Sequence, residues 1–175
     1  MYYIGIDIGT SSVKALLIDS SGRVIKTSVP EYSFQTPKPL WAESDPLDWW
    51  EATQQAIKEL LSKVHSSEIA GIGLTGQMHG MVALNQEGSV LRPCIMWNDQ
   101  RSHLECDEIT ERVGQKKILS ITGNPVLPGF TAPKILWTQK NEPDLFALID
   151  KVVLPKDFIR YKLTGSFFSD VSDAS

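Results

Sequence analysis

The sequence has few cysteines and few histidines, which limits disulfide and metal chemistry. Cys94 and Cys106 are the only cysteines among 175 residues, and they form no Cys-x-x-Cys pair. His79 and His103 lie at spacings from them that match no zinc-binding pattern, so we expect no metal site built on these four residues. In a chain without an export signal, two reduced and packed thiols are the expected state.

The sequence also lacks a long apolar run and an excess of positive charge. No stretch approaches the roughly 18 apolar residues of a membrane-spanning helix. Residues 1–7 have no basic region and reach a carboxylate early, so we expect no signal peptide. The 17 Lys and Arg residues against 21 Asp and Glu give a formal net charge of −4, whereas nucleic-acid binding requires a basic face. These absences predict a cytoplasmic protein that binds neither membrane nor nucleic acid.

Composition and the first 30 residues indicate a folded domain that begins with a β-meander. Hydrophobic residues make up 42% of the chain, which excludes intrinsic disorder, and its length suffices for one stable core. Residues 2–8, 13–18 and 23–29 are apolar segments separated by short turns rich in Gly, Ser and Asp. Such short turns require antiparallel pairing, because a parallel pair needs a long crossover.

A helix is predicted over residues 46–64, after a proline-rich loop. Asp45 suits the N-cap and Pro46 the first helical position. Helical spacing places one apolar face inward. The predicted inward residues are Trp50, Thr53, Ile57, Leu60, Leu61 and Val64.

The remaining elements predict a mixed sheet. A buried strand is expected over 69–75, and shorter strands over 81–84 and 152–154. Helices are expected over 100–114, 117–121, 132–140 and 155–165, with a short one starting at Pro143. Antiparallel strands followed by strand–helix crossovers give an α/β domain with helices on the faces of its sheet, not a purely parallel sheet.

The first candidate site is the segment from Gly5 to Lys14, with the pattern Gly-x-Asp-x-Gly-Thr-Ser-Ser-x-Lys. Gly9 allows close approach to an anion, and the backbone amides and hydroxyls of residues 10–12 form an anion-binding concavity. Asp7 stands at a strand end, where a carboxylate can hold Mg²⁺. The segment matches no Walker A or dinucleotide motif. An ordinary hairpin with a solvated acid explains the same residues equally well.

The second candidate site is the segment Gly-Gln-Met-His-Gly over residues 76–80. Its glycines indicate a tight passage at the end of a strand, where α/β proteins bind ligands. Gln77 and His79 can exchange hydrogen bonds with hydroxyl groups, and Met78 offers an adaptable apolar wall. A structural histidine is the alternative.

The third candidate site is the segment Trp-Asn-Asp-Gln-Arg over residues 97–101. It is rich in donors and acceptors and follows an apolar run. The residues alone favour a simpler interpretation, a helix N-cap at Asn98 or Asp99 with an exposed Arg101.

Together these segments resemble the N-terminal domain of the FGGY carbohydrate kinases, and they are most similar to the members that phosphorylate D-xylulose. The similarity covers essentially the whole chain. It is most specific over residues 3–11, 76–80, 97–101, 129–134 and 154–157. The resemblance implies the actin-like ATPase fold of two ribonuclease-H-like domains. It also implies transfer of the γ-phosphoryl group of ATP to O5 of D-xylulose, with ATP and Mg²⁺ as cofactors.

The same resemblance suggests roles for the phosphate-side residues. Asp7 corresponds to the acid near Mg²⁺ and the phosphates, so it is the candidate catalytic and metal-binding residue. Gly9, Thr10 and Ser11 correspond to the first phosphate loop. Lys14 stands where glycerol kinases have an arginine and is a further candidate for phosphate binding.

The sugar-side residues follow from the other two segments. Met78 and His79 correspond to the sugar-binding pair of the D-xylulose branch, where glycerol kinases have Arg-Glu. Asp99 and Arg101, together with Trp97, match a family motif whose contacts the resemblance leaves open. Gln77, Asp99 and Arg101 complete the candidate substrate-binding set.

The resemblance also implies that residues 1–175 are the N-terminal sugar-binding piece of a longer kinase. The general base, an Asp, and the nucleotide domain are expected beyond residue 175, so we expect no kinase activity from this piece alone. A homodimer is the assembly that the resemblance suggests. The open alternatives are a family kinase for gluconate, ribulose or a deoxy-sugar, and an actin-like or chaperone-like ATPase, against which the second and third segments argue.

Overall fold

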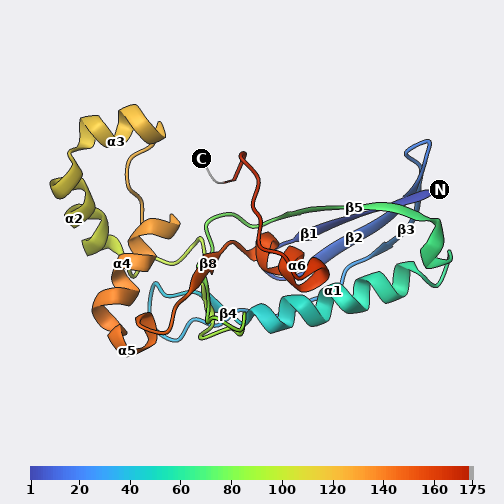
Figure 1. The fold of residues 1–175 in the computed structure, drawn as a ribbon, viewed down its shortest axis with the longest axis horizontal. Coiled ribbons are helices and arrows are strands. Elements are labelled where there is room, and N and C mark those ends of the chain that lie inside the picture. Colours follow the sequence, from blue (N-terminus) through green and yellow to red (C-terminus); the bar gives the residue numbers. More distant parts are fainter. Residues whose placement is uncertain (174–175) are drawn as a thin grey trace. The chain divides into compact units, whose positions relative to one another are not determined.

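The computed structural model describes residues 1–173, which divide into two compact units (Figure 1). The first unit comprises residues 1–34, 45–77 and 155–168. The second comprises residues 35–44, 78–154 and those from Ser169 on. The chain crosses between the units inside the glycine-flanked segment of residues 76–80, between Gln77 and Met78.

The first unit is built on a four-stranded mixed sheet with the strand order β3-β2-β1-β5. β1 (Tyr2–Ile8) pairs antiparallel with β2 (Val13–Asp19), and β2 pairs antiparallel with β3 (Val24–Ser28). β5 (Ile69–Gly76) pairs parallel with β1. The predicted antiparallel opening and the mixed α/β class are therefore confirmed.

Strict alternation along β1 gives this sheet one buried and one exposed face. Ile4, Ile6 and Ile8 are buried, whereas Tyr3 and Asp7 are exposed. α1 (Pro46–Leu60) contacts β2 and β3, and α6 (Pro155–Thr164) contacts β1 and β5. Because the two helices also contact each other, both cover the same face of the sheet (Figure 1).

The start of α1 agrees with the prediction, but its end and its buried face do not. The Asp45 carboxylate accepts a hydrogen bond from the Leu47 amide at 2.9 Å, which confirms the N-cap. The helix ends at Leu60, not at residue 64. Small alanines lie on the inward face, so the buried face is rotated about the helix axis relative to the predicted one. The buried residues are Pro46, Trp49, Ala52, Thr53, Ala56 and Leu60, while Trp50 and Ile57 are only half-buried.

The prediction that the strand over residues 69–75 is buried is wrong. Within the described residues β5 lies at the edge of the sheet, with β1 as its one neighbour. Ile72 is 46% exposed. The apolar, glycine-rich sequence is typical of a central strand, but burial depends on a second neighbour that sequence pattern alone does not supply.

The second unit contains two small antiparallel sheets. β6 (Val82–Leu84) pairs with β8 (Lys151–Val153), and β4 (Glu43–Ser44) pairs with β7 (Cys94–Ile95). The core of this unit joins both sheets to a helix through Met81, Ala83, Ile95 and Trp137. β4 was not predicted, since two residues inside a proline-rich loop carry no periodic signal.

Helices make up much of the rest of the second unit. They are α2 (His103–Val113), α3 (Gln115–Thr122), α4 (Thr131–Asn141) and α5 (Pro143–Phe146). A short 3₁₀ turn, η1 (Ser66–Glu68), precedes β5 in the first unit. The predicted helices are present, with boundaries shifted by a few residues. Within residues 1–173 no helix is long and apolar enough to span a bilayer.

Both cysteines are free and buried, as predicted. Burial raises the pKa of the Cys94 thiol to about 12 and that of Cys106 to about 11. Because the thiolate is the reactive form, both thiols are inert near neutral pH.

Candidate functional site

The turn between β1 and β2 forms a closed loop over residues 9–12. The Gly9 amide donates to the Ser12 carbonyl at 2.9 Å. A Cβ atom at Gly9 would lie 3.0 Å from that same carbonyl oxygen, which is tighter than ordinary contact. Glycine is therefore required for the close turn, and the loop presents its backbone at the end of β1.

Tyr32 holds this loop from a distant part of the first unit. Its hydroxyl donates to the carbonyls of Gly9 at 2.6 Å and Ser12 at 3.1 Å. Its amide also donates to the Ser11 carbonyl at 2.9 Å. Burial, with a smaller effect from the charge of Asp7, raises the pKa of Tyr32, so its hydroxyl stays a donor at any physiological pH.

Sheet register sets three polar side chains in one row beside the loop. Asp7 is opposite Lys14 across β1 and β2, and opposite Thr75 across β1 and β5. Residues paired in this way point to the same face of a sheet. All three are exposed, on the face that the helices leave open.

The end of β5 lies against the same loop. The Gln77 amide donates to the Ile8 carbonyl at 2.7 Å, and its side-chain amide donates to the Gly9 carbonyl at 3.2 Å. A Cβ atom at Gly76 would lie 3.0 Å from the Ile8 side chain. The Gln77 Oε1 atom is buried and has no hydrogen-bond partner among the described residues. The first unit thus brings Asp7, Gly9, Thr10, Ser11, Lys14 and Gln77 together around one loop.

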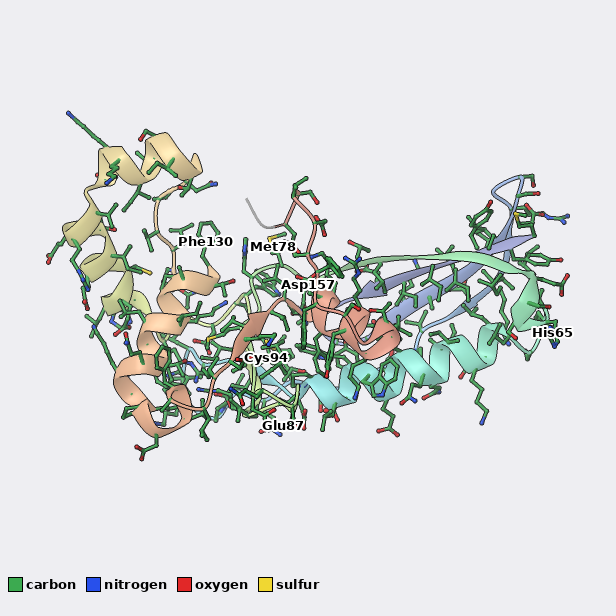
Figure 2. The ribbon with its side chains drawn as sticks, viewed as in Figure 1. His65, Met78, Glu87, Cys94, Phe130 and Asp157 are labelled. Atoms are coloured by element: carbon green, nitrogen blue, oxygen red, sulfur yellow. The ribbon has the colours of Figure 1, made fainter. Side chains whose placement is uncertain are left out.

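In the second unit, Met78 and His79 are presented by a strained turn. His79 has a φ of +60°, a left-handed conformation that is uncommon outside glycine. Its ring packs against the Phe130 ring with centroids 4.5 Å apart. Met78 is 54% exposed, and Figure 2 shows both Met78 and Phe130 projecting from the chain. An apolar thioether and a partly exposed imidazole are therefore available to a ligand.

The surroundings of His79 favour the neutral form of its imidazole. Partial burial lowers the pKa of His79, and the positive charge of Lys134 lowers it further, while Asp173 opposes both. A neutral imidazole has one donor and one acceptor nitrogen. That is the state suited to exchanging hydrogen bonds with sugar hydroxyls.

Two residues of the segment 129–134, which carries part of the family resemblance but was given no role, hold the His79 turn. The Lys134 Nζ donates to the carbonyls of His79 and Gly129, each at 2.7 Å. The Thr131 hydroxyl donates to the same His79 carbonyl at 3.2 Å. A lysine on the apolar face of a predicted helix was the available signal for Lys134, three positions before the buried Trp137.

Asp99 and Arg101 form a buried pair, so the N-cap interpretation with an exposed Arg101 is wrong. The Asp99 carboxylate accepts from the Arg101 amide at 2.8 Å and from its guanidinium at 2.7–3.0 Å. It also accepts from the Ala42 amide at 2.7 Å. α2 instead begins after Ser102. Trp97, just before the pair, is 45% exposed.

The buried pair belongs to a larger cluster of charged and aromatic residues. The Arg101 guanidinium lies 2.7 Å from the Glu43 carboxylate and 3.7 Å from the centroid of the Trp41 ring. Arg92 bridges Glu43 and Glu142 at 2.6 and 2.5 Å. Removing one member of such a cluster leaves an uncompensated buried charge, so it fixes this part of the unit rigidly.

The chain is similar to sugar kinases along nearly its whole length. The model for the N-terminal domain of the FGGY family of carbohydrate kinases matches residues 2–175. The xylulose kinase of Escherichia coli K12 is 47% identical over 99% of this chain and 35% of its own length. A solved structure described as a xyloylose kinase from Brucella ovis is 48% identical, with a TM-score of 0.93 over 99% of this chain and 36% of its own.

A second solved structure, of a kinase named for a different substrate, has a similar fold. The gluconate kinase from Lactobacillus acidophilus is 29% identical, with a TM-score of 0.92 over 99% of this chain and 35% of its own. The chain spans roughly a third of the length of the curated relatives that it matches.

We expect Tyr32→Phe to loosen the residue 9–12 loop, because it removes the hydroxyl that binds two of its carbonyls. The measurement is hydrogen–deuterium exchange of the full-length protein, and we expect the amides of residues 9–13 to exchange about tenfold faster. Tyr3→Phe is the control, since the Tyr3 hydroxyl donates only weakly, to the Met1 sulfur at 3.5 Å. Equal exchange in the two variants would contradict the role of Tyr32.

Proposed function

The chain belongs to the FGGY family of carbohydrate kinases, and we propose that it is the N-terminal domain of a kinase that transfers the γ-phosphoryl group of ATP to O5 of D-xylulose. Its fold is that of the actin-like ATPases, which its sugar kinase neighbours share. The observation that carries the choice of sugar is the 47% identity to a xylulose kinase over 99% of the chain.

The geometry of the first unit supports a phosphate-binding role for the loop after β1. The amides of residues 10 and 11 and the Thr10 and Ser11 hydroxyls would bind phosphate oxygens, whereas the Gly9 amide is already bound to the Ser12 carbonyl. Lys14 and Asp7 flank the loop on the exposed face. Lys14 would stabilise the negative charge of the phosphates. Phosphoryl transfer depends mostly on positioning and charge stabilisation, and these groups would supply both on the phosphate side of the reaction.

Asp7 is the residue that would hold Mg²⁺. Its carboxylate is exposed at the end of β1, and Mg²⁺ is typically bound by one or two carboxylates together with phosphate oxygens and water. When bound, the ion neutralises charge on the phosphates.

The geometry of residues 77–79 supports a sugar-binding role. In the second unit, neutral His79 would exchange hydrogen bonds with sugar hydroxyls and exposed Met78 would contact the carbon chain. In the first unit, the unsatisfied Gln77 Oε1 is a separate candidate acceptor. Because Asp99 and Arg101 are both buried and bind each other, we propose that they support the site by fixing the segment that presents Trp97. The proton of the reacting hydroxyl would pass to a base beyond residue 175.

We expect the full-length protein to phosphorylate D-xylulose with a higher kcat/KM than D-gluconate, D-ribulose or a deoxy-sugar. His79→Ala should raise KM for D-xylulose about tenfold or more and leave KM for ATP unchanged, because it removes hydrogen bonds to the sugar only. His103→Ala, which removes an exposed imidazole, is the control. Preference for another sugar, or an unchanged KM for D-xylulose in His79→Ala, would argue against the assignment.

Asp7→Asn should lower kcat at least about 100-fold, because it removes charge that acts at the transferring phosphate. The melting temperature should stay the same, since the Asp7 side chain is exposed. Asp144→Asn, which neutralises an exposed carboxylate in the first turn of α5, should leave kcat unchanged. The role of Asp7 is refuted by steady-state turnover that stays near the wild-type value.

A further inference from the structure

The proposed function gives no role to Lys134, although its ammonium is buried and donates to two main-chain carbonyls. Lys134 lies in the first half of α4 and is fully buried. Burying an ammonium group is unfavourable unless hydrogen bonds compensate for lost water. Lys156, by contrast, lies 3.0 Å from a carboxylate oxygen of its neighbour Asp157. The position of Lys134 therefore needs an explanation of its own.

The Lys134 ammonium joins two segments that are 50 residues apart in sequence. One is the His79 turn and the other is the turn at Gly129, just before α4, and the Nζ lies 2.7 Å from a carbonyl oxygen of each. The Gly129 turn lies close against the Trp97 backbone, since a Cβ atom there would lie 2.6 Å from the Trp97 carbonyl oxygen. The ammonium thus ties the His79 turn to a segment that packs against Trp97.

The His79 turn needs this support because its backbone is strained. Residues other than glycine rarely adopt a φ of +60°, and such conformations persist only where the surroundings fix them. The Lys134 and Thr131 donors both bind the His79 carbonyl, and the Phe130 ring packs on its imidazole. The start of α4 and the residues just before it thus hold the backbone and the ring of His79.

We propose that Lys134 is a positioning residue for the sugar site: it clamps the His79 and Gly129 carbonyls and so fixes how the His79 imidazole meets the substrate. The sugar part of this inference rests on the proposed function. The clamp itself does not, because it can be observed without any sugar.

The charge of Lys134 adds a second effect on His79. Burial is the first cause of the lowered pKa of His79, the Lys134 charge is the second, and Asp173 acts in the opposite direction. The charged or titratable groups acting on Lys134 are Cys94, Asp99 and Arg101, and burial lowers its own pKa to about 8. At neutral pH Lys134 is therefore mostly protonated, and its charge adds to the effect of burial in favouring the neutral imidazole. Removing this charge favours the imidazolium, so His79 would become protonated at a higher pH.

The test uses Lys134→Met and Lys134→Gln in the full-length protein. We expect Lys134→Met to raise KM for D-xylulose at least about tenfold, with kcat changed less than about threefold and KM for ATP unchanged. Lys134→Gln retains donors for the carbonyls and should raise KM less. A merely structural role would lower the fraction of active enzyme and thus the apparent kcat, without changing KM.

The second measurement is the NMR titration of the His79 imidazole without sugar, its signal being identified by its absence in His79→Ala. In both Lys134 variants it should titrate at a higher pH than in the wild type. Lys140→Met is the matched control: Lys140 lies on the same helix, pairs with Glu105 and Glu108, and does not touch His79. In this variant neither KM nor the titration should change.

The outcomes separate this inference from the proposed function. Wild-type turnover of D-xylulose with an unchanged KM and an unchanged His79 titration in the Lys134 variants overturns the clamp. An upward shift of the titration in a protein that does not phosphorylate D-xylulose supports the action of Lys134 on the His79 imidazole and refutes the proposed sugar. Should Lys134→Met fail to fold, Lys134→Gln still removes the charge and weakens the two contacts, and a KM and a His79 titration that both stay at the wild-type values in this variant overturn the inference.

Discussion

The contact between the buried Lys134 ammonium and the His79 carbonyl is the interaction on which the candidate sugar loop depends. A left-handed histidine turn is unstable in isolation, and its carbonyl needs a donor once it is withdrawn from water. Lys134 supplies that donor at 2.7 Å and at the same time favours the neutral imidazole. Lys134 thereby holds the backbone of the residue that we assign to sugar binding and adds to the effect of burial on its charge state.

The loop after β1 is held in the same way, by a side-chain donor that carries no charge. The Tyr32 hydroxyl binds the Gly9 and Ser12 carbonyls, so a loop with few contacts of its own keeps one shape. In both loops, irregular backbone at a strand end is held by a side chain distant in sequence. A tyrosine, whose hydroxyl stays protonated, adds no charge beside Asp7, whereas the charge of Lys134 contributes to the lowered pKa of His79.

Sequence patterns predicted the three antiparallel strands and the N-cap of α1, because these depend on turn lengths and on neighbouring residues. They failed where burial depends on distant partners. The exposed edge of β5 could not be read from its apolar run, and the buried Asp99–Arg101 pair depends on Trp41 and Glu43, more than 50 residues earlier. The roles of Lys134 and Tyr32 could not be predicted for the same reason, because each contacts a loop that is distant in sequence. The site motifs were visible in the sequence, but the residues that hold them were not.

The central claim is that residues 76–80 present His79 to D-xylulose. The most direct measurement is a crystal structure of the full-length protein with D-xylulose bound. It should show a sugar hydroxyl within hydrogen-bonding distance of the His79 imidazole, with Met78 against the carbon chain and the His79 carbonyl still bound to Lys134. A sugar bound with no contact to residues 76–80 would contradict the claim.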